Sequence, residues 1–252
     1  MDFEEHFKPK RENIKVEIFC VTQNHYNMLE ISTEKIFGEL EDRFEKLSNE
    51  LKLNDQQTQN YFDSKNKIPD LDFISKLDTS QRILNELNWV SDHLKILTEM
   101  RIIHLFKSVE LNLKSIIKIA YPKTESKYFY NWENLNSFFK SLEINYSKCE
   151  GYNEVNDLRK VNNSIKHNST FSYEIKNILE FKNNSEIINY KNYNKFYNRV
   201  ITFANIYVKK ISDAIILERF DFNDEKLNKL TEEFKMRMDK TQLDNFINKL
   251  KE

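Results

Sequence analysis

The sequence predicts an all-α fold, a bundle of long helices with one small β-hairpin. The chain of 252 residues contains only 2 glycines and 3 prolines, so the backbone has few positions that favour a break. Over long stretches the apolar residues recur at three- and four-residue steps, which is the helical period. Hydrophobic residues make up 39% of the chain, enough to form a core.

The first helical stretch runs from Ile14 to Leu53, after a charged lead-in. It is either one long helix or two nearly collinear helices, and it serves either as an antiparallel packing arm or as a dimerising coiled coil. Residues 54–70 are polar and end in Ile68-Pro69-Asp70, which predicts a connector.

A short helix is expected at Leu71–Leu77, with Asp78-Thr79-Ser80 capping the next helix. Residues 81–120 contain neither glycine nor proline. They therefore predict one very long helix, or two helices with a kink near Thr98. Tyr121-Pro122 ends this stretch, because proline disfavours helical backbone in the residue before it.

Two amphipathic helices are predicted next, at Trp132–Leu142 and at residues 154–168, separated by a loop that carries Gly151. Residues 178–181 and 186–190 then alternate in the manner of short strands around the polar turn Asn183-Asn184-Ser185. This pattern predicts the β-hairpin.

Two helices complete the chain, one at Tyr193–Arg219 and a final charged helix over residues 224–252. We therefore predict three parts: an N-terminal helical arm (1–70), a central helical domain (71–222) and a C-terminal helix (223–252).

Composition limits the class of protein. Lys plus Arg number 39 and Asp plus Glu number 40, so there is no strongly basic coat and any nucleic-acid binding must use a local patch. Cys20 and Cys149 lack the spacing of a metal-binding pair, which favours a reducing, cytoplasmic setting. The charged N-terminus lacks the apolar run of a signal peptide, and no apolar run is long enough for a membrane span.

Polar groups are concentrated between Leu158 and Asn168. On a helix, the apolar residues of this stretch lie on one side and form a single stripe: Leu158, Val161 and Ile165. The polar residues fall on the opposite side: Arg159, Asn162, Asn163, Lys166 and His167.

These side chains suit cleavage of RNA. The imidazole of His167 can take the 2′-hydroxyl proton or donate one to the leaving oxygen. Arg159 or Lys166 can stabilise charge on the phosphorane, and the amides of Asn162 and Asn163 can hold phosphate oxygens. No metal or other cofactor is required, and the five histidines are scattered along the sequence. A polar helix end of this composition is, however, very often simply a solvated surface.

The segment Leu158–Asn168 resembles the signature segment of the HEPN superfamily, over about residues 80–218 in all. Many members are small helical, metal-independent endoribonucleases of bacterial defence, toxin–antitoxin and CRISPR systems. Asn163 and His167 match the polar residue and the histidine of the family motif. Glu110, in the segment His104–Glu110, matches a glutamate that the preceding core helix often carries.

One residue departs from the family pattern. The family arginine most often lies five residues before the histidine, where this chain has Asn162; Arg159 is eight residues before His167. The resemblance implies a defence or toxin-type effector that acts on RNA. It also implies a homodimer with a composite active site, and leaves room for a protein partner such as an antitoxin. The alternative is a catalytically inactive helical scaffold that binds RNA or protein.

Overall fold

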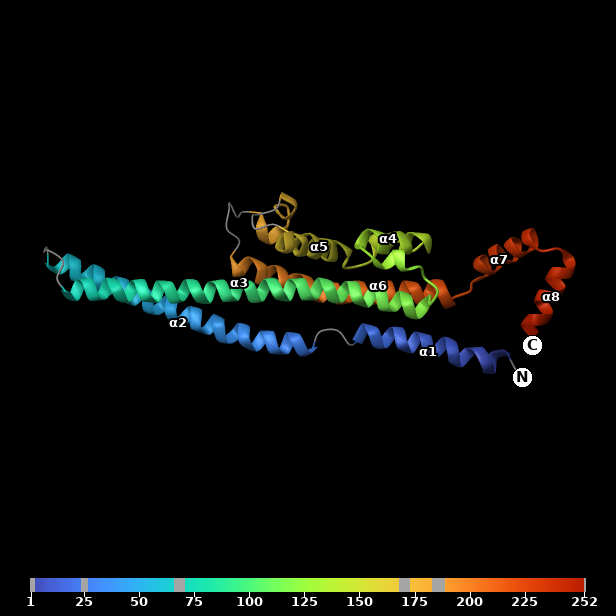
Figure 1. Ribbon diagram of the computed structural model, residues 1–252, viewed down its shortest axis with the longest axis horizontal. Helices are drawn as coiled ribbons and strands as arrows, with labels where there is room; N and C mark the ends of the chain where they lie inside the picture. Colours follow the sequence, from blue (N-terminus) through green and yellow to red (C-terminus); the bar gives the residue numbers. More distant parts are fainter. Residues whose placement is uncertain (1–2, 24–26, 66–70, 168–172, 183–188, 252) are drawn as a thin grey trace. The chain divides into compact units, whose positions relative to one another are not determined.

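The computed structural model describes residues 3–23, 27–65, 71–167, 173–182 and 189–251 (Figure 1). These ranges contain helices and no strand, which confirms the predicted all-α class. The α-helices are α1 (Phe3–Gln23), α2 (Asn27–Lys65), α3 (Leu71–Ala120), α4 (Trp132–Ser141), α5 (Tyr152–His167), α6 (Tyr190–Phe220), α7 (Asp224–Arg237) and α8 (Lys240–Lys251). The short 3-10 helices are η1 (Ser126–Phe129), η2 (Tyr146–Lys148), η3 (Tyr173–Ile175) and η4 (Leu179–Phe181). None of the helices in the described ranges is apolar over a length that could cross a membrane.

The chain forms two compact units. The first unit contains α1, α4, α7, α8 and the C-terminal parts of α3 (from Ser108) and α6 (from Asn205). The second contains α2, α5 from Asn153 onward, and the N-terminal parts of α3 and α6. Each unit thus combines distant stretches of sequence, whereas the predicted parts 1–70, 71–222 and 223–252 are consecutive; that division stays a prediction.

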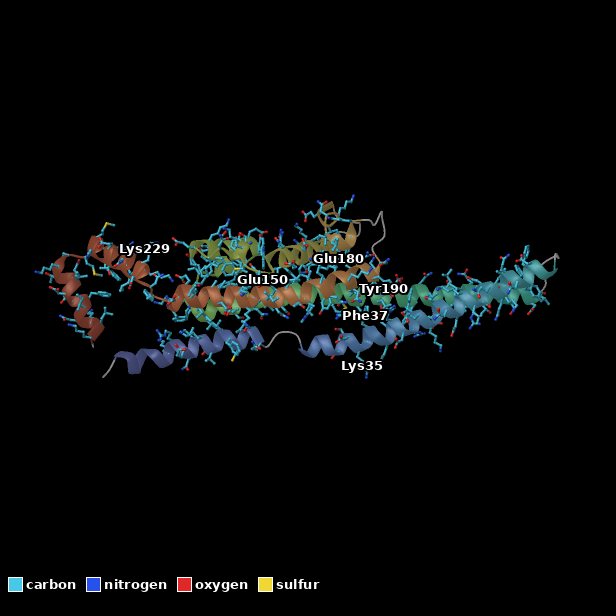
Figure 2. All side chains as sticks on the ribbon, turned by 180° about the vertical axis from the view of Figure 1, so that it is seen from behind. Lys35, Phe37, Glu150, Glu180, Tyr190 and Lys229 are labelled. Carbon is cyan, nitrogen blue, oxygen red and sulfur yellow. The ribbon has the colours of Figure 1, made fainter. Side chains whose placement is uncertain are left out.

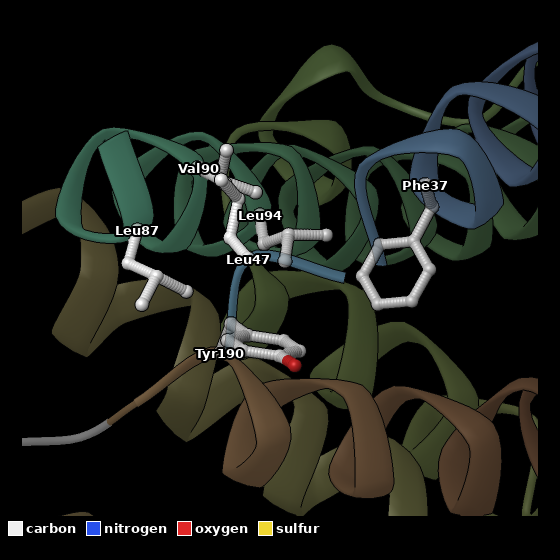
Figure 3. Close-up of a cluster of buried hydrophobic side chains, with 6 residues drawn as sticks. All are labelled: Phe37, Leu47, Leu87, Val90, Leu94 and Tyr190. Carbon is white, nitrogen blue, oxygen red and sulfur yellow. The ribbon is translucent and has the colours of Figure 1, made fainter. Parts of the chain in front are cut away.

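The core of the second unit joins α2, α3 and the start of α6 (Figure 3). The ring of Tyr190, the first residue of α6, contacts Phe37 and Phe44 of α2 edge-on at centroid distances of 6.3 and 5.6 Å. The buried members of this cluster are Phe37, Leu47, Leu87, Val90, Leu94 and Tyr190. Aromatic and aliphatic side chains from three helices therefore fix where α6 begins.

The predicted connector over residues 54–70 is wrong for most of its length, because α2 continues to Lys65. The polar residue Asn54 faces α3, where its Nδ2 donates to the Lys76 carbonyl at 2.9 Å and to the Ser80 Oγ at 2.8 Å. Further along, Tyr61 packs on Phe73 with ring centroids 6.4 Å apart. A helix whose polar residues bond a neighbouring helix has the same composition as a loop, and for this reason the sequence pattern predicted a connector.

The predicted short helix at Leu71–Leu77 is also wrong, since α3 runs without interruption from Leu71 to Ala120. The hydroxyls expected to cap a helix here have other partners: Thr79 Oγ1 donates to the Ser75 carbonyl at 2.9 Å and Ser80 Oγ to Asp55 Oδ1 at 2.7 Å. At Thr98 the helix also continues, and the Thr98 hydroxyl donates to the Leu94 carbonyl at 2.7 Å.

The predicted hairpin is not seen in the described residues. Leu179–Phe181 is a 3-10 turn, and Tyr190 already belongs to α6. Phe181 is fully buried and packs on Tyr193 and Phe196, both at 5.6 Å between centroids, so one ring anchors the turn to α6. The predicted turn Asn183–Ser185 lies outside the described residues.

The first unit is closed by aromatic and aliphatic side chains of α3, α4 and α6. Its fully buried residues include Leu113, Ile116, Ile117, Leu135, Phe139, Tyr207, Ile211 and Ile215. Ile18 of α1 is fully buried, and the Lys15 ammonium lies 5.9 Å from the Phe220 ring of α6.

The final charged stretch forms two helices rather than the predicted single one. They are separated at Asp239, whose Oδ1 accepts from the Gln242 backbone N–H at 2.8 Å. In return the Gln242 Oε1 accepts from the Asp239 N–H at 3.0 Å. This reciprocal pair is a capping box, which starts a new helix at Lys240.

Candidate functional site

Helix α5 forms where the sequence predicted it. Gly151, with φ of 85°, lies in the left-handed region directly before the helix, which glycine adopts without strain. The buried side chains of α5 include Val155, Leu158 and Val161, so the predicted apolar stripe faces the protein interior. The last described residue of the helix is His167.

Three predicted site residues share one line of this helix. Arg159, Asn163 and His167 are spaced four residues apart, and each step of four turns the helix by only about 40°. Arg159 and Asn163 are half-buried and His167 is exposed. The line extends over about 12 Å, given a rise of about 1.5 Å per residue.

Arg159 points toward the N-terminal end of α5. Its Nη2 donates to Asn156 Oδ1 at 3.4 Å, one turn earlier on the same helix. This direction agrees with the general tilt of helical side chains toward the N-terminus. Within one chain, the guanidinium therefore lies away from His167.

Asn162 belongs to the buried side of α5 rather than to the polar side predicted for it. It is 1% exposed, and its Nδ2 donates to Asn163 Oδ1 at 3.2 Å. Its Oδ1 is buried and accepts no hydrogen bond from the residues that the structure describes. Asn162 is thus a buried amide at the place where the family motif carries its arginine.

Lys166 and His167 are exposed on the last turn of α5. The backbone carbonyls at this end of the helix give it a partial negative charge, which favours cationic side chains. These two side chains are open to solvent and can meet an incoming phosphate.

Glu110, the remaining predicted site residue, lies in the first unit, whereas Arg159, Asn163 and His167 lie in the second. Its carboxylate accepts from Lys114 Nζ at 2.8 Å, an ion pair between consecutive turns of α3. Both side chains are about one-fifth exposed, at 24% and 19%. The observed partner of Glu110 is therefore a lysine on its own helix.

No family model, curated protein or solved structure matches the chain. The HEPN resemblance therefore stays a prediction that rests on the residues of α5. Among the described residues, no three histidine, cysteine or acidic side chains gather in a way that could hold a metal ion.

An ionic cluster beside the predicted site was not foreseen. Arg199 of α6 donates through Nε and Nη2 to the two carboxylate oxygens of Glu180 at 2.7 and 3.1 Å, and through Nη2 to Asp157 Oδ2 at 3.3 Å. The label of Glu180 in Figure 2 marks the place. Through this cluster α6 bonds both α5 and the η4 turn, which helps to position α5. Burial raises the pKa of Asp157, and the attraction of Arg199 only partly offsets it.

The first unit contains a pocket of about 640 Å³, between the end of α4, η2, the end of α6 and α7. Its lining includes Cys149, Glu218 and Lys226. Glu218 accepts a hydrogen bond from the Tyr121 hydroxyl, and burial raises the pKa of the Cys149 thiol. The thiol is therefore kept in its protonated, weakly nucleophilic form. Tyr121 and Glu218 are 97 positions apart in sequence, and no local pattern predicts that they meet.

Proposed function

We propose that α5 carries a metal-independent endoribonuclease site that is completed by a second copy of the chain, in a defence or toxin-type effector. The observation that carries the proposal is the line Arg159–Asn163–His167, which is spaced evenly about Asn163 on a well-formed helix. The polar groups on it are those that phosphodiester cleavage requires.

The spacing explains why two copies are needed. Arg159 is directed toward Asn156, and His167 lies about 12 Å further along the axis, so one helix does not offer both groups to one phosphate. When two α5 helices pack antiparallel about a two-fold axis at Asn163, Arg159 of each copy meets His167 of the other. An isologous pair thus builds two identical composite sites.

In each composite site the imidazole of His167 accepts the proton of the 2′-hydroxyl as the 2′-oxygen attacks phosphorus. The bond from phosphorus to the 5′-oxygen breaks, that oxygen takes up a proton from solvent water, and His167 then returns its own proton to solvent. The products are a 2′,3′-cyclic phosphate and a free 5′-hydroxyl. Arg159 of the facing copy stabilises the phosphorane, while Lys166 and Asn163 contact the flanking phosphate oxygens.

Complementation between two inactive variants tests this arrangement. Arg159→Ala and His167→Ala are purified separately and assayed on total RNA in excess EDTA, alone and after mixing. Each variant alone lacks an intact site, but a mixed dimer contains one site with both Arg159 and His167. We expect cleavage to return on mixing, with cyclic phosphate ends on the products.

Lys160→Ala serves as the matched control, because Lys160 is a half-buried cation of α5 on a different line of the helix. It should cleave like the wild type. Failure of the wild type to cut any RNA pool, tRNA included, contradicts the proposal. Activity of the wild type without recovery on mixing contradicts the composite site.

A second candidate is a non-catalytic helical protein that binds RNA or a protein partner. It is favoured by Asn162, which is buried where the family motif has arginine, and by the bond of Arg159 to its own helix. In that case wild-type expression is harmless to cells. RNA or a co-purified protein is then retained without cleavage, and Lys166→Ala weakens RNA retention.

A further inference from the structure

The helical hairpin of α2 and α3 extends beyond the core of the second unit. The buried residues of the core cluster end at Leu47 on α2 and at Leu87 on α3, beside Tyr190 at the start of α6 (Figure 3), and the partly buried Leu51 and Ile83 pack against them. From there to the tip, residues 48–63 and 71–86, no described side chain is buried. We call this part of the hairpin the arm.

Contacts within the arm define which residues face the other helix. Tyr61 and Phe62 both contact the Phe73 ring, at centroid distances of 6.4 and 6.0 Å, and Asn54 bonds both the Lys76 carbonyl and Ser80. The half-buried Ile83 packs against the core cluster. In two antiparallel helices, the residue that directly follows an inward-facing residue points to the same side on both helices.

Four apolar residues occupy such positions. They are Phe62, Ile74, Leu77 and Leu84, which follow Tyr61, Phe73, Lys76 and Ile83, and they are exposed by 54, 54, 48 and 41%. We call this surface the arm face. An apolar surface on one side of a hairpin is unusual for a solvated element, where the outer positions are polar.

The arm face continues a surface that α6 covers nearer the core. Phe44 and Phe62 are 18 residues apart, which is about five helical turns, so both lie on one line of α2. Phe44 contacts the Tyr190 ring at 5.6 Å, whereas Phe62 is 54% exposed. The side of the hairpin that α6 covers at Tyr190 thus stays apolar toward the tip, where α6 no longer covers it.

The charge of the arm face fits a copy of itself. The remaining positions on this side are Ser48, Lys52, Asp55, Gln59 and Gln81. One lysine and one aspartate cancel, and the Asp55 carboxylate already accepts a hydrogen bond from Ser80 at 2.7 Å. Two such surfaces meet without net repulsion, whereas nucleic acid would require an excess of cations.

The size of the face is sufficient for a dimer. The arm has 16 residues on each helix, 48–63 and 71–86, and is therefore about 24 Å long, while two helices packed side by side are about 20 Å wide. The footprint is therefore on the order of 500 Å² on each copy, or about 1,000 Å² in total, which reaches the lower bound of specific interfaces.

We propose that two copies of the chain associate through the arm face, so that their hairpins form an antiparallel four-helix bundle. The arm interface uses no residue of α5, and it does not rest on the endoribonuclease proposal. A dimer that lacks RNA cleavage and a cleaving protein that lacks the arm dimer are therefore distinguishable results.

Sedimentation equilibrium of the full chain tests the proposal. We expect a reversible monomer–dimer equilibrium for the wild type, and a dissociation constant raised by about tenfold or more in Leu77→Glu, because a carboxylate replaces a central apolar contact. Leu77→Glu combined with Leu84→Glu should raise the dissociation constant further, by about a hundredfold relative to the wild type. Because these side chains are about half exposed, the variants should keep the wild-type far-ultraviolet circular dichroism.

The matched control is Leu53→Glu. Leu53 is 57% exposed on the same arm but directly precedes the inward-facing Asn54, so it lies on the opposite side. We expect its dissociation constant to stay within about twofold of the wild type. A monomeric wild type up to about 100 μM, an unchanged dissociation constant in the double variant, or equal weakening by Leu53→Glu each overturns the proposal.

Discussion

Arg199 and Glu180 form a bidentate pair, with Nε and Nη2 of the guanidinium 2.7 and 3.1 Å from the two carboxylate oxygens. The Glu180 side chain is 7% exposed and that of Arg199 is 26% exposed. Charge-assisted pairs of this geometry are stronger than ordinary hydrogen bonds. A carboxylate this well buried is costly to leave without its cation.

We expect Arg199→Met to lower the free energy of unfolding by about 2 kcal/mol, because the Glu180 carboxylate then stays buried without its partner. Urea unfolding followed by circular dichroism measures this change. The matched control is Arg43→Met, whose pair with Glu86 has side chains 51 and 41% exposed. It should cost less than about 1 kcal/mol; equal losses in both variants would show that Arg199 acts by packing alone.

Substitution of Asp157, unlike that of Arg199, should not lower the free energy of unfolding at neutral pH. Burial raises the pKa of its carboxyl, so the folded state holds the proton more tightly than the unfolded state does. As the pH rises from the ordinary value of 3.8 through the raised pKa, the unfolded state binds fewer protons and the stability contributed by this group falls.

Asp157→Asn removes this pH-dependent loss. We expect the variant to be at least as stable as the wild type at neutral pH and to show a flatter stability profile above pH 3.8. Urea unfolding over a pH series measures it. A marked loss of stability at neutral pH would mean that the attraction of Arg199 outweighs the burial of Asp157.

Lys226 of α7 holds the end of α6. Its ammonium donates to the carbonyls of Leu217, Glu218 and Asp221 at 3.2, 2.9 and 3.1 Å, which satisfies groups that a helix C-terminus otherwise leaves open. We expect Lys226→Met to expose the segment between α6 and α7, with faster hydrogen exchange and faster proteolysis there.

The control for Lys226 is Lys229→Met. Lys229 lies on the same helix, is 76% exposed and contacts Glu143 only at 3.6 Å. Its loss should leave exchange and proteolysis at the wild-type rate. Unchanged exchange in both variants would show that α7 is held by its apolar contacts instead.

Tyr190 makes the second unit sensitive to alkali. Burial, reinforced by Glu41 and Glu45, raises the pKa of its phenol from 10 to about 12. Between these values the unfolded state loses a proton that the folded state keeps, so stability falls as the pH rises. We expect Tyr190→Phe to shift the midpoint of alkaline unfolding upward, as measured by circular dichroism. An unchanged midpoint would mean that alkaline unfolding follows the ionisation of other buried tyrosines, such as Tyr193 and Tyr207, whose pKa values burial also raises.

The sequence was most informative where each segment could be judged by its own period. Helix α5 followed from Leu158, Val161 and the polar residues opposite them, and the structure has it at Tyr152–His167. The length of α2 and α3 was not predictable in this way, because Asn54 and Ser80 bond across to another helix and so look like loop residues. Likewise, the cluster of Arg199 with Glu180 and the burial of Asn162 depend on tertiary packing, which no local pattern reports.

The interleaving of the two units sets an order in which the chain can mature on the ribosome. The first unit combines α1 with residues beyond Asn205, so α1 cannot complete its unit until those residues have been made, about 180 positions later. At synthesis rates of about 5–20 residues per second, this interval is on the order of ten seconds. Throughout it, α1 is without the end of α6, where the Phe220 ring lies beside Lys15 in the folded unit.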